Sequence, residues 1–336
     1  MRVAGTRRNG CQVLAALLSL AAVSLAGVPA AAQERGTSNL VIANDLFAGQ
    51  NRYFTSGVRM SWLTSPQDAP SSAVVFARAL PLFSTWDTVR AEYVLDQDIF
   101  TPNNKTKAIP NPNDQPYAGW LYAGLGLAGE SGPILDQIGV SMGVIGPAAL
   151  AKPAYELDHS LRGFGGANGF KYQLKNEPTA QLFYQRSWRG LASASFGSFD
   201  VDVTPHAGFA AGNVYDYANA GLVLRFGPDL SMRDYGPPPV NLTLPGAGFF
   251  IPSARLDWYL FAGADGRAVA RNIFLDGNTF RDSRSVDKKN FVADLTAGFS
   301  LTYGRLHMSY THVLQTPEFA DAAWHQFGEL SGSIRW

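Results

Sequence analysis

The stretch FVADLTAGFSLTY, at residues 291–303, alternates between two kinds of side chain along its whole length. Its odd-numbered positions carry Phe, Ala, Leu, Ala, Phe, Leu and Tyr, and its even-numbered positions carry Val, Asp, Thr, Gly, Ser and Thr. Successive side chains of a β-strand point to opposite faces, so this pattern predicts a strand with one apolar and one mostly polar face. Such strands are typical of transmembrane β-barrels, in which one face contacts lipid and the other faces the lumen.

Similar alternating segments recur along the chain, separated by clusters of Gly, Pro, Asn and Asp. The final segment ends the chain on an aromatic residue, Trp336. The fold class that we predict is therefore all-β, a transmembrane antiparallel β-barrel of about 12 strands with both termini periplasmic. The expected strands are 38–44, 55–64, 89–99, 117–128, 134–145, 177–190, 199–212, 215–226, 254–266, 291–303, 305–314 and 325–336.

The N-terminal end indicates secretion to the bacterial outer membrane. Three arginines within the first eight residues precede an apolar run at 13–28 and three alanines at 30–32. This is the pattern of a cleaved secretory signal peptide. We therefore expect residues 1–32 to be removed and residues 33–336 to form one outer-membrane β-barrel domain.

Composition excludes several other classes. No apolar run after residue 32 reaches the roughly 18–20 residues of a membrane helix. The single cysteine, Cys11, lies in the expected signal peptide, so the mature chain has neither disulfides nor thiolate chemistry. The full chain has 27 basic and 27 acidic residues, and removal of the signal takes away three arginines, so the net charge becomes 27 − 3 − 27 = −3. No basic excess therefore suggests a nucleic-acid partner.

Topology gathers polar residues at one rim. With periplasmic termini, the connections after the first, third and fifth strands face outward, and these are the stretches 44–55, 98–114 and 146–176. All three hold clusters of polar side chains. Because the first six strands are sequential neighbours, their loops share one arc of the barrel, which favours a functional site near the outer leaflet.

The motifs in these loops resemble a known family, the outer-membrane lipid A 3'-O-deacylases. The matching pieces, in order along most of the mature chain, are AND at 43–45, YFTSG at 53–57, QDIF at 97–100, DQPYAGWLY at 114–122, GVIGP at 143–147, His159, and YQLKNEP at 172–178. The resemblance implies a twelve-stranded barrel that requires Ca2+ and hydrolyses the 3'-linked acyloxyacyl ester of lipid A in the outer leaflet. It places Asn44, Asp45, Thr55, Lys107 and His159 at the active-site positions of the family.

The chemistry of these residue types agrees with ester hydrolysis. Imidazole titrates near neutral pH, which suits His159 to the role of general base. Calcium prefers carboxylate and amide oxygens, so Asp45 with Asn44 is a partial ligand set, and the ion would polarise the ester carbonyl. Thr55 would position water or a ligand, and Lys107 would meet a phosphate or a developing negative charge. The nucleophile, water or a hydroxyl, stays open.

The chain also departs from the family pattern. Tyr155 stands where the family has a glutamine, and the i, i+4 spacing on a helix expected at 152–161 places it on the same face as His159. Gln115 stands where many members have an arginine. No acidic residue follows His159 in the stretch 162–166, where some members have one.

Alternative functions remain open at this point. Tyr155 supports a catalytically inactive barrel that binds lipid or has a structural role. A phospholipase-type acyl hydrolase would need a serine nucleophile, and Ser56, Ser61 and Ser160 lie in no recognisable nucleophile motif. A general porin is disfavoured because about twelve strands enclose a narrow lumen. The expected partners are lipid A or lipopolysaccharide and membrane lipids, and the expected state is a monomer.

Two long stretches receive no function from the sequence. Residues 227–253 are rich in proline and fall on the periplasmic side by parity, where turns are usually short. Residues 65–87 fall on the same side and are long enough to hold a short helix.

Overall fold

The computed structural model describes residues 36–80, 86–162, 166–230, 234–237, 244–246 and 248–336. The expected signal peptide, residues 1–32, lies outside these described residues. Among the residues that are described, no helix is long and apolar enough to cross a membrane.

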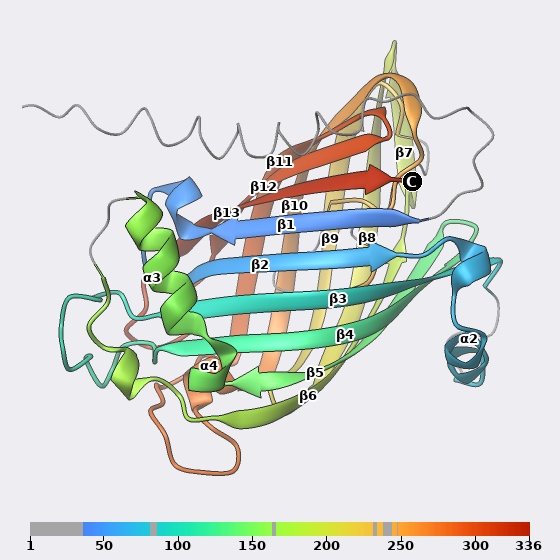
Figure 1. Cartoon of the computed structure of the whole chain (residues 1–336). Coiled ribbons are helices and arrows are strands. Elements are labelled where there is room, and N and C mark those ends of the chain that lie inside the picture. Colours follow the sequence, from blue (N-terminus) through green and yellow to red (C-terminus); the bar gives the residue numbers. More distant parts are fainter. Residues whose placement is uncertain (1–35, 81–85, 163–165, 231–233, 238–243, 247) are drawn as a thin grey trace, which may run out of the picture.

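The described strands form one antiparallel sheet that closes into a barrel (Figure 1). β6 and β7 lie one after the other along the same partner, β8, so that the barrel has 12 strand positions although the sheet has 13 strands. The number of strands predicted from the sequence is thus confirmed. The strands are β1 (Thr37–Asn44), β2 (Tyr53–Leu63), β3 (Thr88–Thr101), β4 (Ala118–Ser131), β5 (Ile134–Ile145), β6 (Glu177–Trp188), β7 (Ala192–Phe196), β8 (Phe199–Gly212), β9 (Tyr215–Gly227), β10 (Ser253–Asn272), β11 (Phe291–Gly304), β12 (Leu306–Gln315) and β13 (His325–Arg335).

Two pairings close the barrel. The first strand pairs with the last, from Thr37 opposite Arg335 to Asn44 opposite Gly328. β6 pairs with the 206–212 part of β8, whereas β7 pairs with its 199–203 part. Pro205 lies between these two parts, where β8 changes partner and the missing N–H of proline interrupts no ladder on that side.

The alternation that predicted the strands also predicts their faces. In β11, Leu295 and Phe299 point outward and are exposed, whereas Asp294 and Ser300 point into the lumen and are buried. This arrangement gives the barrel an apolar outer surface and a polar interior, as the outer membrane requires.

Short helices occupy the connections. They are η1 (Asp45–Ala48), η2 (Pro66–Asp68), α2 (Ser71–Arg78), η3 (Pro147–Ala149), α3 (Ala151–Arg162), η4 (Phe170–Tyr172) and α4 (Ile273–Asp276). α3 lies where the sequence predicted a helix. α3 and α4 lie at one end of the barrel, and α2 lies at the other (Figure 1).

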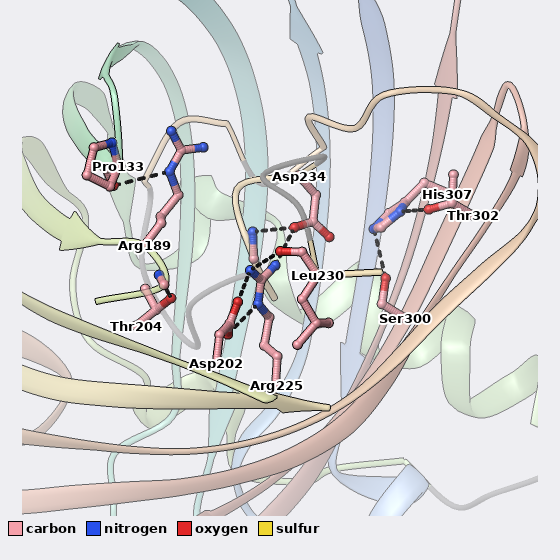
Figure 2. Close-up of polar contacts among 12 residues, drawn as sticks. Pro133, Arg189, Asp202, Thr204, Arg225, Leu230, Asp234, Ser300, Thr302 and His307 are labelled. Carbon is pink, nitrogen blue, oxygen red and sulfur yellow. Dashed lines mark hydrogen bonds and ion pairs between the residues drawn. The ribbon is translucent and has the colours of Figure 1, made fainter. Parts of the chain in front are cut away.

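The described residues of the connection between β9 and β10 fold into the lumen at the α2 end. Asp234 from this connection accepts a hydrogen bond from Arg225, whose guanidinium also binds Asp202 (Figure 2). Further along, the Pro245 carbonyl accepts from Gln137 of β5. The connection, which we call the plug (the described residues of 228–252), thus occupies this mouth of the barrel.

Candidate active site

Asn44 and Asp45 shape the first loop at the α3 end of the barrel. Asn44 ends β1 in extended conformation, and its Oδ1 accepts a hydrogen bond from the Leu46 N–H at 2.9 Å, which caps η1. The Asp45 side chain is fully buried, and its Oδ2 accepts a hydrogen bond from the Arg52 N–H. Both residues therefore hold the loop in place, and Asp45 also puts a carboxylate into a low-dielectric environment.

Lys105 from the second loop lies next to Asp45. Its ammonium donates a hydrogen bond to the Asn51 Oδ1 and lies 5.5 Å from the centre of the Tyr155 ring. Burial lowers the pKa of Lys105 to about 8, because desolvation disfavours the charged amine, and the Asp45 carboxylate acts in the opposite direction. Lys107, which the resemblance placed in the active site, is exposed. The structure thus places the Lys105 amine near the Asp45 carboxylate.

Tyr155 and His159 lie one turn apart on α3 and are both buried. Their rings stack with centroids 3.7 Å apart and an interplanar angle of 24°. The His159 Nδ1 is 3.1 Å from the Tyr155 carbonyl oxygen and 3.7 Å from an Asp158 carboxylate oxygen. Because both neighbours are acceptors, Nδ1 carries the proton in the neutral ring and Nε2 carries the basic lone pair.

The charge of Asp45 in the first loop affects the pKa of Tyr155 on α3. Burial raises the pKa of the Tyr155 hydroxyl well above its usual value, and negative charge on Tyr117 or Asp45 raises it further. Tyr155 is therefore a neutral phenol at physiological pH. Asp45, Lys105, Tyr155 and His159 form a connected group to which three different loops contribute.

The second and third loops are held together by an aromatic cluster. Tyr117 packs against Phe170 with ring centroids 4.7 Å apart, and Phe170 packs against Tyr155 at 5.5 Å. The Lys105 carbonyl accepts hydrogen bonds from the Asn168 N–H at 3.1 Å and from the Tyr117 hydroxyl at 3.5 Å. These contacts fix the backbone that presents the Lys105 amine.

Thr55 occupies an irregular position in β2. The register with β3 pairs Phe54 with Phe100 and Ser56 with Ile99, so Thr55 is the extra residue of a β-bulge. Its Oγ1 lies 2.6 Å from the Thr101 Oγ1, and both residues are buried. The hydroxyl is held inside the rim, at the base of the first loop.

The donor chemistry fits a hard cation such as Ca2+ in type. Asp45 offers a carboxylate, and Asn44 and Thr55 offer neutral oxygens. The described residues contain no group of three His, Cys, Asp or Glu side chains arranged for a metal. A cation here would therefore depend on one carboxylate together with neutral protein oxygens and substrate oxygens, and Lys105 would compete for the same carboxylate.

The substituted position Gln115 lies below the site. Its side chain is buried and lines a lumen cavity together with Arg267 and Glu318. An arginine side chain therefore still faces this part of the lumen, although it comes from β10 rather than from position 115.

The sequence alone did not indicate the central position of Lys105 or the bulge at Thr55. Two lysines two residues apart in a polar loop look alike in a sequence, and only the fold of the loop separates a buried amine from an exposed one. The bulge follows from the register of two strands, which the alternation pattern does not define to one residue.

Fold and site together define a class of protein, an outer-membrane antiparallel β-barrel with a buried polar site at one rim. The family described as "Outer membrane protein LpxR" matches residues 14–336. The chain belongs to this family.

A solved structure agrees with this fold. LpxR from Salmonella typhimurium is 18% identical, with a TM-score of 0.73 over 89% of this chain and 99% of that chain. The β-domain of the Bordetella autotransporter BrkA is 9% identical, with a TM-score of 0.44 over 90% of this chain and 100% of that chain. No curated protein sequence matches.

Proposed function

We propose that this protein is a lipid A deacylase, which hydrolyses the 3'-linked acyloxyacyl ester of lipid A in the outer leaflet of the outer membrane. The observation that carries the proposal is the buried group of Asp45, Lys105, Tyr155 and His159 at one rim of a barrel of the LpxR family. Family membership supports the substrate class, and the side chains supply the groups that ester hydrolysis needs.

His159 is the general base in this proposal. With Nδ1 directed at the Tyr155 carbonyl, Nε2 takes a proton from the attacking water as the oxygen adds to the ester carbon. When the tetrahedral intermediate collapses, the same nitrogen returns the proton to the leaving sugar hydroxyl. The products are the free acyloxyacyl acid and lipid A with a free 3'-hydroxyl.

Lys105 stabilises the negative charge that develops on the carbonyl oxygen. A cation in a buried site acts through a low dielectric and needs no reorganisation during the reaction. Ca2+, when bound by Asp45 with Asn44, would add Lewis-acid polarisation of the same carbonyl. Thr55, held at 2.6 Å from Thr101, orients the water or a ligand from the base of the loop.

A lipid-binding barrel without hydrolysis is the second candidate. One observation favours it: Tyr155, in place of the family glutamine, stacks on the imidazole at 3.7 Å. A phenol that covers one face of the ring restricts how water and ester approach the base.

Mass spectrometry of lipid A from cells that express each variant tests the proposal. We expect the wild type to remove one acyloxyacyl unit and His159→Ala to leave lipid A intact. His312→Ala is the matched control, because this histidine lies on β12 and bonds to Gln326, outside the site. Purified wild type treated with a chelator should lose activity if Ca2+ takes part. Unchanged lipid A from a folded, inserted wild type would refute the deacylase and leave the lipid-binding barrel.

A further inference from the structure

The described residues of the connection between β2 and β3, 64–80 and 86–87, include α2 and pack against the outer surface of the barrel at the end opposite α3. α2 and the residues beside it cover Val89 and Ala91 of β3 and Leu127 of β4, with Ile138 and Tyr184 completing the cluster. In β3, these side chains alternate with lumen-facing Arg90 and Glu92, which contact the plug. The segment therefore lies on the face of the strands that points away from the lumen.

Hydrogen bonds to the Asp136 carboxylate hold this segment on the outer face of the barrel. Asp136 of β5 accepts two hydrogen bonds of 2.8 Å from Arg186, one of 2.9 Å from the Tyr184 hydroxyl and one of 3.1 Å from the Trp86 indole N–H. The Trp86 ring lies directly on the strand, since a Cβ at Gly129 would come within 2.2 Å of it. Trp86 thus holds the end of the connection beside the outward-facing Asp136 carboxylate, both oxygens of which accept hydrogen bonds.

The opposite face of α2 is exposed and mostly apolar, with Ser72 beside Val75 and Phe76. Ala77 points to the barrel and is buried, whereas Val75 and Phe76 point away with 69% and 68% of their surface exposed. Ala79 shares this face because residues three and four apart lie together on a helix. Arg78, in the last turn, is exposed beside it. Two large adjacent apolar side chains held outward on a packed helix indicate a contact surface.

The register of the strands shows where α2 lies relative to the membrane. Trp62 and Tyr93 stand opposite each other on the outer face of β2 and β3, and Ser38, opposite Trp62 in β1, accepts a hydrogen bond from the Trp336 indole. Such aromatic rows mark the membrane–water interface of barrels. Ala91, under α2, is two residues beyond Tyr93, about 7 Å along the strand. α2 is therefore at the level of the lipid headgroups.

We propose that α2 is an interfacial membrane helix whose Val75–Phe76 face inserts into the phospholipid leaflet at the end of the barrel opposite the candidate active site. The occupant is lipid because the exposed face continues the lipid-contacting surface of β3, where Tyr93 and Leu95 are exposed just above it. Arg78 is placed for phosphate groups at the same level. Helices of this kind, apolar on one side with a basic residue at the boundary, bind in the plane of the interface.

Through this helix the protein contacts the membrane with an element that lies outside the strands of the barrel. The helix fixes the depth of the barrel wall in the inner half of the membrane, on the arc of strands β3–β6. The inference depends on the barrel's location in the outer membrane with the α2 end on the periplasmic side, and not on the proposed hydrolysis.

Fluorescence quenching in lipid nanodiscs tests the proposal with the mature chain, which contains no cysteine once the signal is removed. An environment-sensitive label on Phe76→Cys is compared with Leu95→Cys, which faces lipid, and with Gln67→Cys, which is exposed before α2. We expect phospholipids with brominated acyl chains to quench positions 76 and 95 at least three times more than position 67. Aqueous iodide should show the reverse order.

A second variant keeps the proposed anchor intact. Ala79→Cys retains Val75 and Phe76, so its label reports on the same face even if the Phe76 substitution weakens insertion. Equal iodide quenching of positions 79, 76 and 67, without an effect of brominated lipid, would overturn the proposal. Quenching that required two protein copies per disc would overturn it in favour of a contact between copies of the chain.

Discussion

Lys105 and Lys107 are chemically identical and two residues apart, yet only Lys105 is buried. Lys105 is buried against Asn51, Asp45 and Tyr155, and Lys107 is exposed. The difference arises from the loop backbone, which the Asn168 N–H and the Tyr117 hydroxyl hold at the Lys105 carbonyl. A charge in a buried site acts more strongly on a developing oxyanion than a solvated one.

The burial of Lys105 predicts a pH dependence of hydrolysis. Its pKa is lowered to about 8, so the amine loses its proton at a lower pH than a solvated lysine does. In the proposed mechanism the ammonium form stabilises the oxyanion, and kcat/KM should therefore fall as pH rises through about 8. Lys105→Arg stays charged over this range and should move the alkaline limb to higher pH.

Truncation of the two lysines provides the matched comparison. Lys105→Met should lower kcat/KM about 100-fold, the usual order for removal of one charge-stabilising group. Lys107→Met should stay within about twofold, because its side chain is exposed. Ester hydrolysis of purified lipid A, followed across pH, measures both. Equal losses in the two variants would contradict a special role of Lys105.

For the individual residues of the candidate site, the sequence predicted some features and missed others. The shared helical face of Tyr155 and His159 followed from their spacing, and the structure shows the two rings stacked. The bulge at Thr55 depends on the register of two strands, and the burial of Lys105 depends on contacts between separate loops. Patterns in the local sequence do not predict such tertiary contacts.

Among the elements, the sixth strand position shows the limit of reading strands from alternation. The sequence predicted one strand at 177–190, and the structure has β6 at Glu177–Trp188 followed by β7 at Ala192–Phe196. β7 has only five residues, and its alternation of alanine and serine is too short and too weakly apolar to indicate a strand. The proline-containing strand at 199–212 was predicted with its bounds, and β8 spans the same residues.

The link between the plug and the strands predicts a large effect on stability. Arg225 of β9 donates to Asp202 of β8 and to Asp234 of the plug, and all three are buried (Figure 2). Arg225→Met leaves two buried carboxylates without their cation, which typically costs about 3–5 kcal/mol. We expect a lower unfolding temperature, measured by circular dichroism in detergent.

An exposed arginine at the same end of the barrel serves as the control. Arg255→Met lies in β10 on an exposed position and should change stability by no more than about 0.5 kcal/mol. Similar unfolding temperatures for Arg225→Met and wild type would show that the plug does not depend on this contact.

For the molecule as a whole, the plug predicts a barrel that does not conduct. Its described residues contact the lumen side of strands around the barrel, through Pro245 with Gln137 and the Gly246 N–H with Glu92. Replacement of residues 229–251 by a short Gly-Ser linker should open this mouth, and steady conductance in planar bilayers should rise above that of the closed wild type. Equal currents would mean that the loops at the α3 end alone seal the barrel.

The global architecture was more predictable than the site. The period of two, the turn residues and the aromatic C-terminus indicated about twelve strands, and each of the expected strands has a counterpart in the structure. The path of the plug was not predictable, because its contacts with Gln137 and Glu92 join residues more than 100 positions apart.

The pairing of the first strand with the last determines when the candidate site is completed during folding. Asn44 stands opposite Gly328 at the α3 end of this seam, and Asp45 follows it directly. Contacts across nearly the whole chain form slowly, because the intervening residues must first be ordered. The first loop thus acquires its final support only when the C-terminal strand arrives, so barrel closure during biogenesis also completes the candidate site at this rim. A chain still in transit through the periplasm would carry all of these side chains without the geometry to use them.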